Sequence, residues 1–84
     1  MSKVVWSPQA RRAMTTYRKD DPGGIDQVLD SVNLLRKHPR PPGAQAYGRD
    51  LLRIRVGRYR VRYEIVNREP LVPGIETVGR TPGP

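Results

Sequence analysis

The chain has 84 residues, which is enough for one small domain with a single modest core. Sixteen Lys and Arg residues against eight Asp and Glu give a formal charge of +8. This charge favours an anionic partner, nucleic acid or an acidic protein, over the alternative of a generic solubilising coat. The absence of cysteine and the single histidine exclude a disulfide framework and a thiolate zinc site, so we expect no metal and no cofactor.

A short strand and two helices are predicted for the first half of the chain. Residues 3–6 are β-branched and aromatic and predict a strand. Ser7 and Pro8 are typical of a helix start, and apolar residues then recur at helical spacing as far as Tyr17. Residues 20–24 predict a turn or an N-cap. The apolar stripe of a second helix follows at Ile25, Val28, Leu29, Val32 and Leu35.

A basic cluster at residues 36–38 is predicted to close the second helix. Positive side chains complement the helix dipole in a last turn, and Pro39 cannot continue the helix. We therefore interpret His38 as a capping or solvated residue, with a general acid or base role as the less favoured alternative. Residues 40–49 are rich in proline and glycine and predict a loop that returns to the sheet.

The segment 50–66 predicts two antiparallel strands joined at Gly57 and Arg58. Strict alternation gives these strands one apolar and one charged face. The apolar row contains Leu52, Ile54, Val56, Tyr59, Val61, Tyr63 and Ile65. The charged row contains Arg53, Arg55, Arg60, Arg62 and Glu64. Because opposite side chains of an antiparallel pair lie about 5 Å apart, these arginines repel one another, which indicates an anionic partner.

A further strand is predicted over residues 71–78, although Pro73 and Gly74 interrupt it. It either begins at Ile75 or carries a bulge at the sheet edge. Residues 79–84 have no periodicity and predict a frayed end. We expect one domain over residues 1–80 and a flexible tail over 81–84. No secretory signal or membrane-spanning apolar run is visible, so we expect a cytoplasmic protein without membrane contact.

Three motifs carry a resemblance to a known family: Trp6-Ser7-Pro8, the L-x-R-x-x-x-G-x-Y-R-V-x-Y-E segment over residues 51–64, and Val78-Gly79-Arg80. With the order of elements, they make nearly the whole chain resemble the RelE/ParE superfamily of bacterial toxins from type II toxin–antitoxin pairs. The resemblance implies an α+β fold with the order β-α-α-β-β-β. It also implies a curved, mostly antiparallel sheet of four strands, with two helices on one face and the basic surface on the other.

The superfamily contains two activities. RelE-like members cleave mRNA in the ribosomal A site and inhibit translation, whereas ParE-like members inhibit DNA gyrase without nuclease chemistry. We favour a RelE-like endoribonuclease. The alternatives are a gyrase inhibitor, a weakly active member that mainly binds its antitoxin, and an unrelated basic RNA-binding domain. The implied partners are a cognate antitoxin with an acidic or amphipathic segment, the ribosome with its mRNA and rRNA, or DNA gyrase.

The resemblance also implies a site. By position in the motifs, the catalytic basic residues correspond to Arg53, Arg55, Arg60 and Arg80. We expect the RNA-binding residues to include Arg58, Arg62 and Tyr47, the last by stacking on a base. Family nucleases often carry lysine where this chain has Arg53 and Arg55, and no basic residue or tyrosine follows Thr81.

The general base is the missing part of this site. RNA cleavage of this type needs a base for the 2′-hydroxyl, and arginine is a poor one because its pKa lies above about 12. The candidates are Glu64, Glu76, His38 and the tyrosines. Glu64 lies in the arginine row, where a salt bridge to its neighbours is the favoured interpretation. Tyr59 and Tyr63 share the apolar row and are expected in the core.

Overall fold

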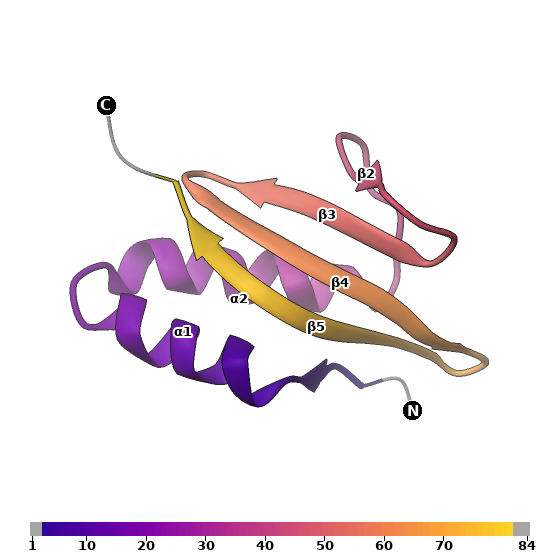
Figure 1. Cartoon of the computed structure of the whole chain (residues 1–84), viewed down its shortest axis with the longest axis horizontal. Coiled ribbons are helices and arrows are strands. Elements are labelled where there is room, and N and C mark those ends of the chain that lie inside the picture. The colour runs from indigo at the N-terminus through magenta and orange to yellow at the C-terminus, as the bar shows by residue number, and fades with distance from the viewer. Residues whose placement is uncertain (1–2, 82–84) are drawn as a thin grey trace.

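Two helices cover one face of a five-stranded sheet in the computed structural model, which describes residues 3–81 (Figure 1). In chain order the elements are β1 (Val5–Trp6), α1 (Pro8–Arg18), α2 (Pro22–Leu34), β2 (Gln45–Ala46), β3 (Leu51–Val56), β4 (Tyr59–Arg68) and β5 (Leu71–Arg80). The strand order in the sheet is β1-β5-β4-β3-β2. Strand β1 is parallel to β5, and the other pairs are antiparallel. The predicted α+β class is confirmed, but the predicted number of four strands is wrong.

Both helices begin where the capping residues predict. The Ser7 Oγ accepts the Ala10 N–H at 3.0 Å and donates to the Glu76 carbonyl at 2.6 Å, so this N-cap also ties α1 to β5. The Asp21 carboxylate accepts the Gly24 N–H at 3.1 Å and caps α2. Helix α2 ends at Leu34, so the prediction that residues 36–38 close its last turn is wrong. These residues come after the helix, and the turn that follows it covers residues 35–37. Neither helix, within residues 3–81, is long and apolar enough to cross a membrane.

The core lies between the helices and the apolar row of β3 and β4. Tyr59, Val61 and Tyr63 are almost completely buried there, as the alternation predicts. Their partners include Ala10, Met14, Ile25, Val28, Val32, Leu35, Ile75 and Val78. Strands β3 and β4 meet at a tight turn, in which Gly57 has a φ of +59°, a value that glycine adopts without steric cost.

Strand β2 lies in the segment 40–49, where only a loop was predicted. Its two residues pair with Leu52 and Arg53 of β3, and the Tyr47 N–H donates to the Leu51 carbonyl at 3.0 Å. Two residues are too few to show alternation, and the pairing depends on the free edge that β3 offers. The pairing brings Tyr47 to the edge of the sheet.

Strand β5 runs from Leu71 to Arg80, so a start at Ile75 and a frayed end at residues 79–80 are both wrong. Pro73 pairs with Ile65 of β4, and the Ile65 N–H points away from β5 and donates to the backbone carbonyl of Asp50. A proline is tolerated at such a position. The Pro73 nitrogen therefore faces away from β4, and no ladder hydrogen bond is lost. The register of β4 and β5 shifts twice, which confirms the predicted bulge. The predicted position at the sheet edge is wrong, because β5 lies between β1 and β4.

Thr81 follows β5 and is bound to the turn between β3 and β4. Its N–H and its hydroxyl both donate to the Arg58 carbonyl, at 2.7 and 3.0 Å. The rest of the predicted flexible tail, residues 82–84, lies outside the described residues.

The buried Tyr63 anchors the loop after α2. Its hydroxyl donates to the Pro39 carbonyl at 2.6 Å, and burial raises the pKa of this phenol to about 12. Replacing Tyr63 with phenylalanine should therefore lower the free energy of unfolding by about 0.5–1.5 kcal/mol. Urea denaturation measures this change, and hydrogen exchange should quicken at the Arg40, Gly43 and Ala44 amides. The control is Tyr47→Phe, which removes the same hydroxyl from an exposed ring. Equal stability losses in the two variants would contradict the anchoring role.

Candidate nucleic-acid interface

Four arginines project from the sheet face opposite the helices. The register places Arg53 directly across from Arg62 and Arg55 directly across from Arg60, and all four side chains are exposed. We call these four residues the arginine face. No ion pair joins any of them to a carboxylate of residues 3–81. Two like-charged cross-strand pairs without counterions destabilise a sheet, so this face is suited to an anionic ligand.

Neutral groups orient three of these guanidinium groups. Arg53 donates to the Gln45 amide oxygen at 2.5 Å, and Arg55 donates to the Gly57 carbonyl at 3.2 Å. The Arg62 Nε donates to the Tyr47 hydroxyl at 3.1 Å, and its guanidinium carbon lies 4.7 Å from the centroid of that ring. The hydrogen bond from Arg62 to Tyr47 raises the pKa of Arg62. The contacts with neutral groups hold the donors in place without cancelling their charge.

A polar hollow lies among these arginines. It has a volume of about 290 Å³, and its lining includes Gln45, Arg53, Arg55 and Arg60. Arginines from both strands thus line one concave site. Such a cluster can make several charge-assisted hydrogen bonds to one phosphate group.

Two carboxylates accompany the arginine face. Glu64 is exposed opposite Leu51 and Gly74, and it forms no ion pair with any residue of 3–81, so the predicted salt bridge is wrong. The reason is that its cross-strand neighbours carry no charge. Glu76 is the extra residue of a β5 bulge, next to the residue that pairs with Arg62, and its negative charge contributes to the raised pKa of Arg62.

Arg80 lies with the helices, apart from Arg53, Arg55 and Arg60. It pairs with the buried Tyr59 and therefore points to the helix side of the sheet. Its Nη1 lies 2.9 Å from the Asp20 carboxylate, and its guanidinium carbon lies 4.6 Å from the Tyr17 ring centroid. The hydrogen bond to Asp20 raises the pKa of Arg80.

Arg58 also lies away from the arginine face, with its Nη2 3.3 Å from the Asp21 carboxylate. The same carboxylate accepts the Tyr59 hydroxyl at 2.7 Å. These contacts, with the Gly24 N–H, lower the pKa of Asp21, and the Tyr59 hydrogen bond has the largest effect. The sequence predicted a turn or an N-cap here. Its link to Tyr59 was missed because 38 residues separate the two side chains.

His38 lies on the helix side, in the lining of an apolar groove beside the end of α2. The structure therefore does not bring His38 together with Glu64. Among residues 3–81 no three His, Asp or Glu side chains cluster as metal ligands do.

The comparisons with known proteins agree on one fold. Residues 4–81 match the family model described as the ParE toxin of type II toxin–antitoxin systems, parDE. The YoeB/ParE toxin from Agrobacterium tumefaciens is 13% identical with a TM-score of 0.79, over 96% of this chain and 99% of that one. The isolated RelE toxin of E. coli is 19% identical with a TM-score of 0.75, over 96% and 85%.

A chain of the toxin–antitoxin complex RelBE2 from Mycobacterium tuberculosis is 23% identical with a TM-score of 0.73, over 93% of this chain and 95% of that one. No curated protein matches the sequence. The structural likenesses concern the fold, whereas the family match spans almost the entire chain. The chain therefore belongs to the ParE toxin family and is the toxin of a type II toxin–antitoxin system of the RelE/ParE superfamily.

Proposed function

We propose that this toxin acts in the cytoplasm as a ribosome-dependent endoribonuclease that cleaves mRNA in the A site. The arginine face supports the proposal most directly, because it presents two cross-strand arginine pairs that form no ion pair with a carboxylate of residues 3–81. Tyr47 beside Arg62 offers an exposed ring on which a base could stack. The resemblance to RelE-like toxins supplies the reaction, and the ribosome would present the extended message.

The proposed reaction is attack of a 2′-oxygen on the adjacent phosphorus. A base takes the proton of the 2′-hydroxyl, and the bond from phosphorus to the 2′-oxygen forms as the bond to the 5′-oxygen breaks. Water protonates the leaving 5′-oxygen, which leaves a cyclic phosphate and a 5′-hydroxyl. Arg53, Arg55 and Arg60, which line the polar hollow, would stabilise the extra negative charge of the pentavalent phosphate. Glu64 is the proposed base, because its exposed carboxylate shares this face and lies about 7 Å along β4 from Arg62.

Primer extension on a defined message in a purified translation system tests the function. New 5′ ends at the A-site codon, found only when ribosomes are present, are the expected result. Cleavage of free RNA at the same sites would contradict ribosome dependence. An intact message with normal translation would contradict the nuclease itself.

Replacing Glu64 with glutamine should lower the single-turnover cleavage rate about 10²–10⁴-fold, the range typical of losing a general base. Ribosome binding should not weaken, because the change removes a negative charge from a cationic surface. The matched control is Glu69→Gln, at an exposed residue between β4 and β5. An unchanged rate in Glu64→Gln would remove this residue from the mechanism.

A second candidate function is inhibition of DNA gyrase without chemistry. Two observations favour it: the family that matches is that of ParE, and Arg80 is bound to Asp20 away from the arginine face. A supercoiling assay with purified gyrase distinguishes the two candidates. Inhibition of supercoiling together with an intact message would replace the nuclease proposal.

A further inference from the structure

A second pocket lies beside the polar hollow, where strand β2 meets β3. It has a volume of about 240 Å³ and is lined by Gln45, Ala46, Tyr47, Arg53 and Arg62. We call it the β2 pocket. The polar hollow adjoins it, because Gln45 and Arg53 line both. Taken together, the two lie within the ~300–1,000 Å³ of pockets that bind small ligands.

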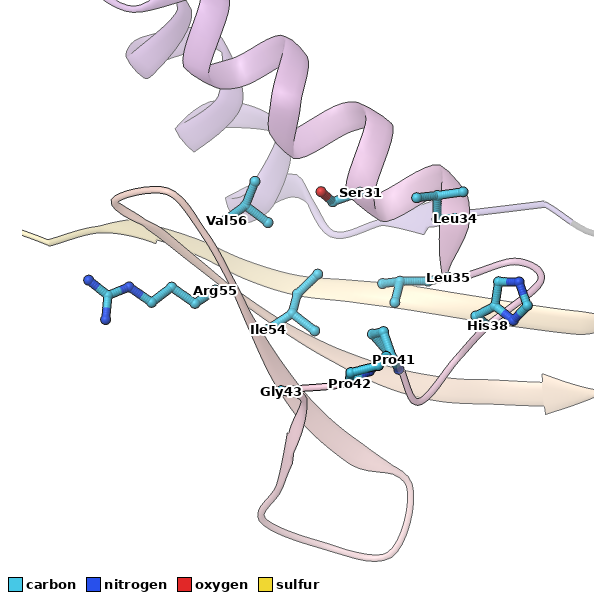
Figure 2. A pocket seen from close by; sticks show the side chains of 10 residues that line it. All are labelled: Ser31, Leu34, Leu35, His38, Pro41, Pro42, Gly43, Ile54, Arg55 and Val56. Atoms are coloured by element: carbon cyan, nitrogen blue, oxygen red, sulfur yellow. The ribbon is translucent and has the colours of Figure 1, made fainter.

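The two pockets suit different parts of a nucleotide. Three arginines line the polar hollow, which suits a phosphate group. Figure 2 shows the Arg55 side chain extending away from the apolar groove at the end of α2, so its charge is left to the hollow. In the β2 pocket, the 42% exposed Tyr47 offers a ring for stacking a base. Arg53 and Arg55 are about 7 Å apart along β3, a distance comparable to that between the base and the phosphate of one nucleotide.

The side chains of the β2 pocket offer hydrogen-bond donors to a base. Arg53 donates to the Gln45 side-chain oxygen, and this leaves the Gln45 amino group as a free donor. The Nε of Arg62 donates to the Tyr47 hydroxyl, which leaves the hydroxyl proton and the other Arg62 donors for a ligand. No carboxylate of residues 3–81 lines either pocket. The base must therefore supply the acceptors.

Guanine is the base that meets these donors best. Its O6 and N7 are adjacent acceptors, whereas adenine carries an amino group in place of O6. A guanidinium group can bind O6 and N7 together, and the amino group of a glutamine can donate to either. The amino group of adenine would instead face other donors and lose its hydrogen bonds to water without replacement.

We propose that the β2 pocket and the polar hollow together bind a guanine nucleotide, with its base against Tyr47 and its phosphate beside Arg55 and Arg60. Gln45 and Arg53 are the specificity-determining residues, because the oxygen of Gln45 orients Arg53 and both side chains donate to the base. The proposal deepens the proposed function, on which it rests for the presence of RNA at this face, by naming the base that the site recognises.

Binding of mononucleotides to the free protein tests the site. Isothermal titration calorimetry should show that guanosine 5′-monophosphate (GMP) binds about tenfold more tightly than the adenosine nucleotide (AMP). Guanosine, which lacks the phosphate, should bind about tenfold more weakly than GMP. Equal binding of GMP and AMP would leave only a phosphate site and would overturn the proposal. Guanosine binding as tight as that of GMP, or no binding of GMP at millimolar concentration, would overturn it too.

Gln45→Leu is the decisive variant, because it removes the amide and nearly keeps the size of the side chain. It should lower the preference for GMP over AMP from about tenfold to about twofold or less. Tyr47→Leu should weaken binding of both nucleotides about tenfold, because stacking does not distinguish the two purines. The control is Gln27→Leu, the same change at an exposed residue of α2 outside both linings. A preference for GMP that is as strong in Gln45→Leu as in Gln27→Leu would contradict the assigned role of Gln45.

Short RNAs distinguish a nucleotide within a chain from a free one. Tighter binding of the pentanucleotide UUGUU than of GMP, with a preference over UUAUU, would assign the site to RNA, and the opposite order would assign it to the free nucleotide. None of these measurements needs a ribosome or RNA cleavage. An intact message together with a preference for GMP would contradict the nuclease alone. Cleavage together with equal binding of GMP and AMP would contradict this site alone.

Discussion

Replacing Arg55 and Arg60 together with alanine should weaken ribosome binding about 10–100-fold and abolish growth arrest. The two residues face each other across β3 and β4, and both line the polar hollow, so they can contact the same stretch of phosphates. Each lost phosphate contact removes about 0.7 units from the slope of log affinity against log salt for a single strand. The double variant should therefore lose about 1.4 units of slope.

The same variant should fold at least as well as the original chain. Removing two directly opposed like charges should raise the free energy of unfolding by about 0.2–1 kcal/mol. Loss of activity with gain of stability is the signature of a ligand-binding surface. The control is Arg11→Ala with Arg12→Ala on α1, which removes the same charge from exposed positions on another element. Equal losses of binding in both double variants would mean that net charge, and not the arginine face, binds the target.

The arginine face could be predicted from the sequence because it depends on a local rule. The period of two in β3 and β4 assigns Arg53, Arg55, Arg60 and Arg62 to one face, and the tight turn at Gly57 sets their register. The starts of α1 and α2 also depend on a local rule, because Ser7 and Asp21 each accept the N–H of the residue three positions later.

The position of Arg80 could not be predicted, because it depends on where β5 bulges. Without a bulge, residues 75, 77 and 79 would share the core face and Arg80 would point to the arginines. The extra residue Glu76 shifts this alternation by one, so that Val78 is buried and Arg80 lies toward the helices. Pro73 and Gly74 indicated an irregular strand, but they gave no signal at Glu76.

The Asp21–Tyr59 contact should make the fold sensitive to acid. Because the folded-state pKa of Asp21 lies below its ordinary value of 3.8, its contribution to stability is complete above pH 3.8. It is lost as the pH falls through the lower folded-state pKa, where the carboxylate becomes protonated in the folded protein too. Tyr59→Phe removes the main cause of the lowered pKa, and it should lower the melting temperature at pH 7 by roughly 4–8 °C.

The difference between Tyr59→Phe and the original chain should shrink below pH 3.8, which thermal unfolding followed by circular dichroism across pH 2–7 would measure. Tyr17→Phe is the control, because its ring also contacts Tyr59 but does not bond to Asp21. A melting-temperature difference that stays constant with pH would show that Tyr59 acts through packing alone. A difference that shrinks at low pH would show that the Tyr59 hydroxyl stabilises the fold through the Asp21 carboxylate, which also binds Arg58 in the turn between β3 and β4.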